Sequence, residues 1–277
     1  GLEPTLSIIK ISKNVAIANK ESIICGWNLI NKNLNKYKCN FIPIDSEHFS
    51  ILSLIKNYKA SQIETIYLTA SGGPFLNLSK TKFNNITPVS AVKHPNWKMG
   101  KKISIDSATL MNKVFEIIEA QRIFQLPLSK FKILIHPSSY VHAAVKFHNG
   151  TTQFLVHDTS MVVPIFNSLY GDDNNRTLRT KKIDFNKINN LDFKQVDKSR
   201  FPLVNTLKDI SNNISMFETV LVSANDYFVE LFLKKKISYL DIYKNIKKII
   251  KIKEFTRLKQ IKPKNALEVI KLSKYVV

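Results

Sequence analysis

The sequence predicts an α/β protein that ends in a bundle of helices. Over the first 45 residues, helical and strand-like apolar segments alternate, which is typical of a parallel sheet. Further on, two apolar segments flank Asn149-Gly150, a favoured two-residue hairpin turn. From Phe201 to Val277 the apolar spacing is helical throughout. The predicted fold is therefore the end of a parallel sheet, an α/β domain with a hairpin, and a C-terminal helical bundle.

The elements of the first part follow in order. The expected helices are 6–11, 21–34 and 46–58, and the expected strands are 15–18, 41–44 and 65–69. The second strand ends at Asp45. Each strand is followed by a helix or a polar loop, as expected where strands of a parallel sheet end at one edge.

The second part mixes loops with regular elements. Residues 88–102 show little periodicity and predict a loop of the kind that forms a lid or a binding segment. A helix is expected from Ser107 to about Ile123, then a strand at 132–135 and the hairpin strands 141–147 and 152–156. Residues 172–200 are polar and predict a connector, and 201–277 predict four helices.

Length and composition exclude several classes of protein. The 277 residues suffice for one large domain or two ordinary ones, and 44% hydrophobic with 23% charged residues is typical of a soluble globular chain. No apolar run approaches the roughly 20 residues that span a bilayer, so we expect no membrane partner. The two cysteines, Cys25 and Cys39, are expected to be buried free thiols in a reducing compartment. Because the chain begins with Gly1 rather than Met, we expect a processed or truncated start.

The net charge of +21 raises the question of a nucleic-acid partner. The lysines are scattered, and in the most basic stretch, 233–264, they alternate with Ile and Leu as on amphipathic helices with a solvated face. No helix-turn-helix, zinc finger or aromatic RNA-binding motif is present. We therefore expect no nucleic-acid partner, although a basic surface would attract an anionic substrate.

Asp45 and Glu47 stand where a strand ends and a helix begins. Residues two apart in an extended segment point to the same side, so both carboxylates can reach one cation. Such oxygen ligands suit Mg²⁺ or Mn²⁺. The same Asp-Ser-Glu pattern also fits an ordinary helix N-cap with an acidic first turn, and the pattern alone leaves both interpretations open.

The expected helix from Ser107 offers a polar face with Thr109, Asn112, Lys113 and Glu116. Ser107 and the free amides of a helix start can bind a phosphate, and Lys113 adds positive charge. The alternative is an amphipathic helix with a solvated face. A Ser71-Gly72-Gly73 turn, His94, and the loop residues Trp97 and Met99 are further candidates, none specific by itself. The seven glycines cannot form a dinucleotide-binding Gly-x-Gly-x-x-Gly or a P-loop.

Six short motifs, in order, resemble the signatures of the 1-deoxy-D-xylulose 5-phosphate reductoisomerase family. They are Ala18-Asn-Lys-Glu-Ser22, Pro43-Ile-Asp-Ser-Glu-His48, Leu68-Thr-Ala-Ser-Gly-Gly-Pro-Phe75, His94-Pro-Asn-Trp-Lys-Met-Gly100, Ile103-Ser-Ile-Asp-Ser-Ala-Thr109 with Met111-Asn-Lys113, and Ile135-His-Pro-Ser-Ser139. The resemblance weakens beyond Asp172. Departures are Ala70 in place of a common glycine, Val114-Phe115 in place of Gly-Leu, and Ser138 in place of a frequent Gln.

The resemblance implies a role for each candidate residue. Divalent-metal ligands would be Asp45, Glu47 and Glu116. The residues that contact the sugar's oxygens would be Lys20, Ser46 and Asn112. The phosphate would be bound by Ser71, His94, Ser107, Asn112 and Lys113. A flap would include Trp97 and Met99, and NADPH would touch Asn19, Glu21 and Gly100. The implied reaction is a metal-assisted rearrangement of the phosphosugar followed by reduction with NADPH, giving 2-C-methyl-D-erythritol 4-phosphate.

The resemblance also implies an organisation. Residues 1–44 would be the end of a Rossmann-type NADPH-binding domain, 45–171 the catalytic domain, 172–200 a connector and 201–277 the helical domain. Since the glycine-rich turn is absent, we expect the chain alone to reduce its substrate poorly. A homodimer is expected, in the cytoplasm or in a plastid-like organelle. A phosphosugar isomerase or lyase without a redox cofactor is the first alternative, and a basic nucleic-acid-binding protein the second.

Overall fold

The computed structural model describes residues 1–171 and 175–276. Its helices are α1 (Leu2–Ile9), α2 (Lys20–Tyr37), α3 (Ser46–Ile55), α4 (Pro88–Ala91), α5 (Lys101–Thr109), α6 (Met111–Phe124), α7 (Val162–Tyr170), α8 (Phe185–Asn189), α9 (Phe217–Leu233), α10 (Tyr239–Ile249), α11 (Lys253–Thr256) and α12 (Ala266–Tyr275). The strands are β1 (Asn14–Ile17), β2 (Asn40–Pro43), β3 (Ile63–Ala70), β4 (Phe131–Ile135), β5 (Val141–Phe147), β6 (Thr152–Val156) and β7 (Lys194–Gln195).

The N-terminal part contains the parallel strand pair that the sequence predicts. Strands β1 and β2 pair in register, with Val15 opposite Phe41, and α2 connects them. Helix α1 begins and ends earlier than expected, at Leu2 and Ile9 rather than at residues 6 and 11. Burial explains the shift, because Ile9 is fully buried whereas Ile11 is 83% exposed.

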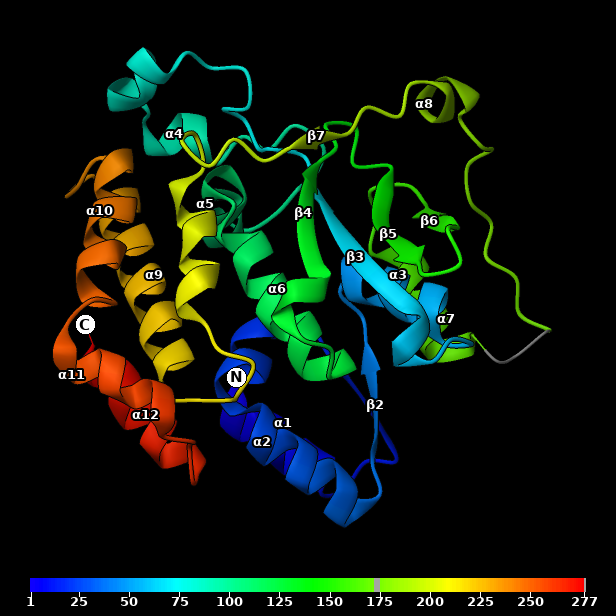
Figure 1. Cartoon of the computed structure of the whole chain (residues 1–277), viewed down its shortest axis with the longest axis horizontal. Helices are drawn as coiled ribbons and strands as arrows, with labels where there is room; N and C mark the ends of the chain where they lie inside the picture. Colours follow the sequence, from blue (N-terminus) through cyan, green and yellow to red (C-terminus); the bar gives the residue numbers. More distant parts are fainter. Residues whose placement is uncertain (172–174, 277) are drawn as a thin grey trace.

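A five-stranded mixed sheet forms the centre of the molecule (Figure 1). Its order is β6-β5-β3-β4-β7, with β3 and β4 parallel and the other pairs antiparallel. Helices α3 and α6 pack on it through apolar residues such as Ile51, Ile66 and Ile117. The predicted α/β class is confirmed. Asp45 after β2 and Ser71 after β3 line the same cavity as residues of α6.

The hairpin is present, but its turn is longer than predicted. Phe147 pairs with Thr151, and residues 148–150 form a three-residue turn. Gly150 adopts φ = 86°, a left-handed conformation that glycine reaches at little steric cost. The hairpin therefore belongs to the class with three-residue loops, in which the last loop residue adopts the left-handed conformation.

The helix expected to begin at Ser107 does not begin there. Helix α5 starts at Lys101, inside the predicted loop, and ends at Thr109, and Leu110 in the left-handed region (φ = 59°) separates it from α6. No glycine or proline marks this break in the sequence. The Tyr239 hydroxyl of α10 donates to the carbonyl of Ala108 at 2.7 Å, so a distant helix satisfies the end of α5.

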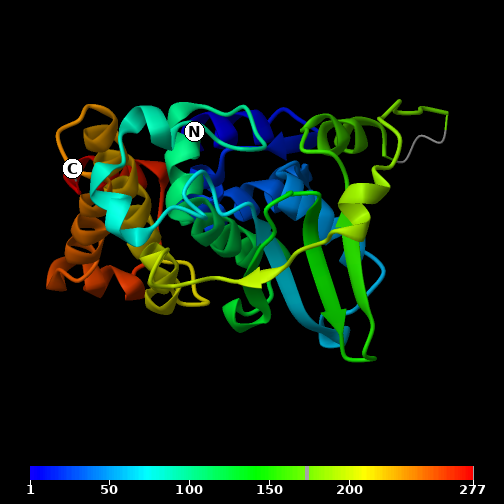
Figure 2. The same cartoon turned by 90° about the horizontal axis from the view of Figure 1, so that it is seen from above.

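The C-terminal part is helical, as predicted. Helices α9 to α12 lie together beside α6, at the opposite end of the molecule from the β5–β6 hairpin (Figures 1 and 2). A buried ion pair between Arg122 of α6 and Glu218 of α9 joins the two parts, at 2.5 Å. The predicted connector contains α8 and β7, which pairs with β4 at the sheet edge. Its residues 172–174 lie outside the described residues.

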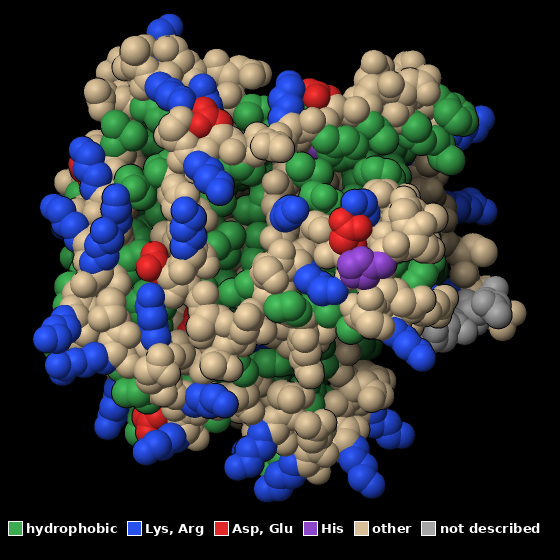
Figure 3. Space-filling model, viewed as in Figure 1, with side chains coloured by type: hydrophobic (Ala, Val, Ile, Leu, Met, Phe, Trp, Pro, Cys, Tyr) green, Lys and Arg blue, Asp and Glu red, His purple; other side chains and the backbone are tan. Residues whose placement is uncertain are grey.

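Lys and Arg side chains are spread over the visible face, while hydrophobic side chains gather where β5, β6 and α8 lie (Figure 3). Exposed apolar side chains on these elements are Phe154 and Val156 of β6 and Phe185 of α8. Among the described residues, none of the helices combines the length and apolarity that a bilayer crossing requires. Both cysteines are free and buried, as predicted.

Candidate active site

A cavity of about 210 Å³ opens where the ends of β2 and β3 face α5 and α6. Its walls come from segments far apart in the sequence. They include every residue that the sequence predicts for the metal, the substrate and the flap: Lys20, Asp45, Ser46, Glu47, Ser71, His94, Trp97, Met99, Ser107, Asn112, Lys113 and Glu116. Thus the fold gathers these residues around one space.

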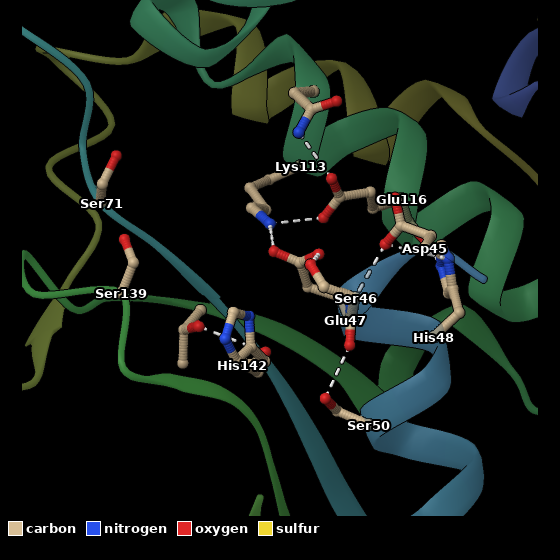
Figure 4. A network of polar contacts seen from close by, with 12 residues as sticks. Asp45, Ser46, Glu47, His48, Ser50, Ser71, Lys113, Glu116, Ser139 and His142 are labelled. Atoms are coloured by element: carbon tan, nitrogen blue, oxygen red, sulfur yellow. Dashed lines mark hydrogen bonds and ion pairs between the residues drawn. The ribbon is translucent and has the colours of Figure 1, made fainter. Parts of the chain in front are cut away.

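Three carboxylates converge on one side of the cavity (Figure 4). Asp45, Glu47 and Glu116 each offer an oxygen, and these oxygens lie within 4.8 Å of one another. Asp45 also caps α3, because its Oδ1 accepts from the backbone N–H of Glu47 at 3.1 Å. The capping and ligand interpretations are therefore compatible. Three hard oxygen donors at this separation fit a Mg²⁺ or Mn²⁺ ion that keeps some of its water.

Two buried lysines pair with these carboxylates. Lys113 Nζ donates to Glu47 and, at 2.5 Å, to Glu116. Lys20 Nζ donates to Asp45 and lies 3.3 Å from Glu116. The ammonium groups lower the electrostatic repulsion between the carboxylates.

The pKa values of Glu116 and Asp45 are shifted in opposite directions. Burial, and then the neighbouring Glu47, raise the pKa of Glu116 to about 7, against the lowering effect of the ammonium groups. For Asp45, burial by itself acts to raise the pKa, but the ammonium group of Lys20 holds it well below its usual range. A divalent cation at this position would favour the ionised form of both.

A polar corner on the opposite side joins Ser71 and His94, whose Oγ and Nε2 lie 3.0 Å apart. The His94 Nδ1 accepts from the backbone N–H groups of Asn96 and Trp97, so Nε2 carries the hydrogen of the neutral ring. Burial and then Lys113 lower the pKa of His94 to about 4. Since Ser71 Oγ also accepts from Gly73 N–H, its own hydrogen is free to donate to an anion.

Ser107 reaches the cavity from the last turn of α5 rather than from a helix start. The prediction that free amides of a helix N-terminus surround Ser107 is therefore wrong. Thr109 is also absent from the cavity wall, because its hydroxyl donates back to Ile105 O at 3.1 Å. Asn112 does face the cavity and donates to Glu116 at 2.5 Å.

The loop that carries Trp97 and Met99 covers part of the cavity. Asn96 ties it down through hydrogen bonds to Pro137 O at 2.6 Å and to Ser139 Oγ at 2.9 Å. The Trp97 ring meets His142 edge-on at 6.1 Å. The loop therefore rests on the turn between β4 and β5.

The three residues expected to touch NADPH lie outside the cavity wall. Asn19 caps α2 and accepts from Ser22 N–H at 2.9 Å, Glu21 pairs with Lys102 at 3.0 Å, and Gly100 is the N-cap of α5. Asn19 and Glu21 stand at the start of α2, on either side of Lys20. Gly100 stands at the start of α5, directly after the loop with Trp97 and Met99.

Sequence reasoning missed several cavity residues, among them Ser139, His142 and Met161. His142 lies on β5 and is 2% exposed. A lone histidine in an apolar strand carries no signal of its own. Gly73 has a different role from the expected approach to a ligand: a Cβ there would lie 2.9 Å from Ala108 Cα, so it allows β3 to approach α5.

Comparisons with known proteins identify the family of the chain. Residues 41–124 match the model of the 1-deoxy-D-xylulose 5-phosphate reductoisomerase C-terminal domain, and residues 157–276 match that of the DXP reductoisomerase C-terminal domain. A 1-deoxy-D-xylulose 5-phosphate reductoisomerase from Pelagibacter ubique is 57% identical over 276 residues, which are 100% of this chain and 71% of the relative. The chain belongs to this reductoisomerase family.

Other members of the reductoisomerase family are similar over nearly the whole chain. The Sulfurihydrogenibium protein is 39% identical and covers 94% of this chain and 68% of its own length. The Zymomonas mobilis reductoisomerase in complex with NADPH has a TM-score of 0.84 at 33% identity, over 99% of this chain and 70% of the other. A reductoisomerase with NADPH, fosmidomycin and magnesium has a TM-score of 0.88 at 30% identity, over 99% and 71%.

The predicted family and fold class are thus confirmed, and the family is one of enzymes. NADPH and magnesium, the predicted cofactors, are present in solved relatives.

Proposed function

We propose that the full-length protein converts 1-deoxy-D-xylulose 5-phosphate to 2-C-methyl-D-erythritol 4-phosphate, with a divalent metal and NADPH, in the non-mevalonate route to isoprenoids. The main support is the convergence of Asp45, Glu47 and Glu116 beside a cavity whose far side carries hydroxyl and imidazole groups. Family membership supports the same reaction.

In this proposal Asp45, Glu47 and Glu116 hold Mg²⁺ or Mn²⁺. With the cation bound, the site gains a Lewis acid that polarises the substrate's carbonyl. The sugar's oxygens are contacted by Lys20 and Ser46. In the structure without substrate, the Ser46 hydroxyl donates to Glu47 at 2.6 Å. These side chains orient the substrate for breaking and remaking a carbon–carbon bond.

The opposite side binds the phosphate. His94 donates from Nε2 to Ser71 Oγ, which leaves the Ser71 hydroxyl hydrogen free to donate toward the cavity, while Ser107 and Asn112 add polar groups and Lys113 adds charge. Charge-assisted hydrogen bonds of this kind are the strong ones. Closure of the Trp97 and Met99 loop over the bound substrate excludes water from the reacting centre.

Hydride transfer requires NADPH, which Asn19, Glu21 and Gly100 are proposed to contact. In the same proposal residues 1–44 end an NADPH-binding domain, 45–171 form the catalytic domain, 172–200 connect, and 201–277 form the helical domain. The β1–β2 pair is a two-stranded parallel sheet, and the glycines of the 277 residues form no Gly-x-Gly-x-x-Gly motif. The 277-residue chain is therefore proposed to bind NADPH weakly.

A homodimer is proposed as the assembly. Strand β6 lies at the edge of the sheet, and Phe154 and Val156 on it are exposed, as are Ile165 and Leu169 of α7. Apolar edge strands tend to be covered by a partner. Light scattering during gel filtration tests this, and a monomer at micromolar concentration would contradict it. The reduced thiols fit the cytoplasm or a plastid-like organelle.

The reaction is tested with purified full-length protein, 1-deoxy-D-xylulose 5-phosphate, NADPH and MgCl₂ or MnCl₂. NADPH consumption should require both substrate and metal, and the product should be the branched tetritol phosphate. The same assay on the 277-residue chain should give little turnover. A full-length protein that isomerises or cleaves the phosphosugar without consuming NADPH contradicts the proposal.

A further inference from the structure

Glu119 is a buried carboxylate that the proposed function does not use. It lies on α6 one turn after Glu116 and is 1% exposed. Its Oε2 accepts no hydrogen bond within the described part of the chain. A buried carboxylate oxygen without a donor is costly, so its retention beside the carboxylate cluster requires an explanation.

The neighbouring histidine does not satisfy Glu119. His48 Nε2 lies 2.9 Å from the carbonyl oxygen of Glu116, which can only accept, so Nε2 carries the hydrogen. In the neutral ring Nδ1 has none to give, and it too is without a hydrogen-bond partner. It lies between two carboxylate oxygens, 3.4 Å from Asp45 Oδ1 and 3.5 Å from Glu119 Oε2. Figure 4 shows His48 beside Asp45 and Glu116, behind the cluster.

The nearest ammonium group is that of Lys20, 4.0 Å from Glu119 Oε2. Lys20 is 8% exposed and contacts Asp45 and Glu116. It therefore lies on two of the three carboxylates assigned to the metal. A divalent cation bound there would repel this ammonium group strongly, because both charges lie in a buried region.

The charges of the cluster balance once a divalent cation is added. The carboxylates are Asp45, Glu47, Glu116 and Glu119, and the ammonium groups are Lys20 and Lys113. With His48 neutral and all four carboxylates ionised, the state that a bound cation favours, negative charges exceed positive charges by two, which is the charge of one Mg²⁺ or Mn²⁺. Without Glu119 the metal-loaded cluster would carry an excess positive charge.

We propose that Glu119 is a positioning residue that receives the ammonium group of Lys20 when a divalent cation binds Asp45, Glu47 and Glu116. The exchange frees two metal ligands and gives the unpartnered Glu119 oxygen a donor. It also keeps Lys20 at the edge of the cavity, within reach of a substrate oxygen. This inference rests on the metal site of the proposed function.

The test is a Mn²⁺ titration of the 277-residue chain followed by electron paramagnetic resonance of the free ion. Glu119→Gln keeps the side-chain shape but removes the charge, and Mn²⁺ affinity should fall by about tenfold or more, as for outer partners of metal ligands. Glu64→Gln is the matched control, because Glu64 pairs with Lys146 at the surface. Unchanged affinity in Glu119→Gln overturns the inference.

A double-mutant cycle with Lys20→Met separates this role from a general electrostatic one. Without Lys20 there is no ammonium group to receive, so Glu119→Gln should then have a much smaller effect on Mn²⁺ affinity. An equal loss in both backgrounds contradicts the exchange. Should Glu119→Gln not fold, Lys20→Met alone decides: Mn²⁺ should bind at least as tightly as to the unchanged chain, and weaker binding overturns the inference.

Mn²⁺ binding by the unchanged chain distinguishes failure of the metal site from failure of the role of Glu119. If the unchanged chain binds no Mn²⁺, the metal site and with it the proposed function are overturned. If the unchanged chain binds Mn²⁺ and Glu119→Gln binds it equally well, only the role of Glu119 is overturned.

Discussion

A carboxylate oxygen of Asp45, at the end of β2, lies within 4.8 Å of one of Glu116, in the first turns of α6. Neither element by itself makes a cation site. Helix α3 holds Asp45 through its capping bond, and packing of α6 against the sheet sets the position of Glu116. The distance between these two residues is therefore the property on which metal binding depends.

Glu116→Gln should remove tight Mn²⁺ binding. The amide is a neutral, weaker ligand, and loss of an outer partner alone costs about 10–100-fold in affinity, so we expect a loss of at least about 100-fold. Magnetic resonance titration of free Mn²⁺ measures it, with Glu64→Gln as control. An affinity within threefold or so of the unchanged chain would show that Glu116 is not a ligand.

Mn²⁺ should stabilise the folded chain. Because the unfolded chain does not hold the three carboxylates together, a concentration about 100 times the dissociation constant should add roughly 2.7 kcal/mol to the free energy of unfolding. Urea unfolding with Mn²⁺, compared with EDTA, measures this. The gain should be absent in Glu116→Gln, and an equal gain in that variant speaks against the site.

Stability should fall on the acid side of neutrality because of His142. Burial, and then the stacked His157, lower its pKa from about 6.5 to about 4. Between these values the unfolded chain binds a proton that the folded chain does not. The contribution is therefore fully present above about pH 6.5 and is lost as the pH falls toward 4, by roughly 3 kcal/mol at most.

Unfolding in urea at about pH 7 and about pH 5 checks this prediction. His142→Gln should lower the pH dependence relative to the unchanged chain, while His148→Gln, on the exposed hairpin turn, serves as control. An unaltered pH dependence in His142→Gln means that other groups are responsible.

Arg122→Met should destabilise the chain by about 3–5 kcal/mol, because it leaves the charge of Glu218 buried and unpaired. Both side chains are 1% exposed. The double change Arg122→Met with Glu218→Leu should restore much of the loss, since it removes both charges. Thermal unfolding of Arg122→Met, Glu218→Leu and the double variant measures the three losses of stability. If the loss in the double variant equals the sum of the two single losses, the prediction is wrong.

Gly73→Ala should lower stability by more than about 1 kcal/mol. Gly73 has φ = 65°, which is costly for a residue with a Cβ, and that Cβ would lie 2.9 Å from Ala108 Cα. The strand end would have to move away from α5, and Ser71 with it. Gly150→Ala, with φ = 86° but open space around it, isolates the backbone term. An equal loss in both variants would exclude the close approach.

Local patterns predicted much of the fold because they report local forces. The alternation up to Asp45 predicted the parallel β1–β2 pair, and the helical spacing after Phe201 predicted α9 to α12. Patterns failed where a distant group decides. The break at Leu110 depends on Tyr239 closing the end of α5, and neither residue is a usual helix-breaking signal.

In the candidate site, too, local sequence predicted some features and long-range packing decided others. The sequence by itself determined the chemical groups: the carboxylates, the hydroxyl and imidazole donors, the ordered motifs, and through them the family. Only the tertiary structure decided that Glu116 reaches Asp45, that His142 faces the cavity, and that Glu119 lies beside Lys20 without a donor. Residue types are read from the chain, whereas distances between segments far apart in it follow from how helices and sheet pack.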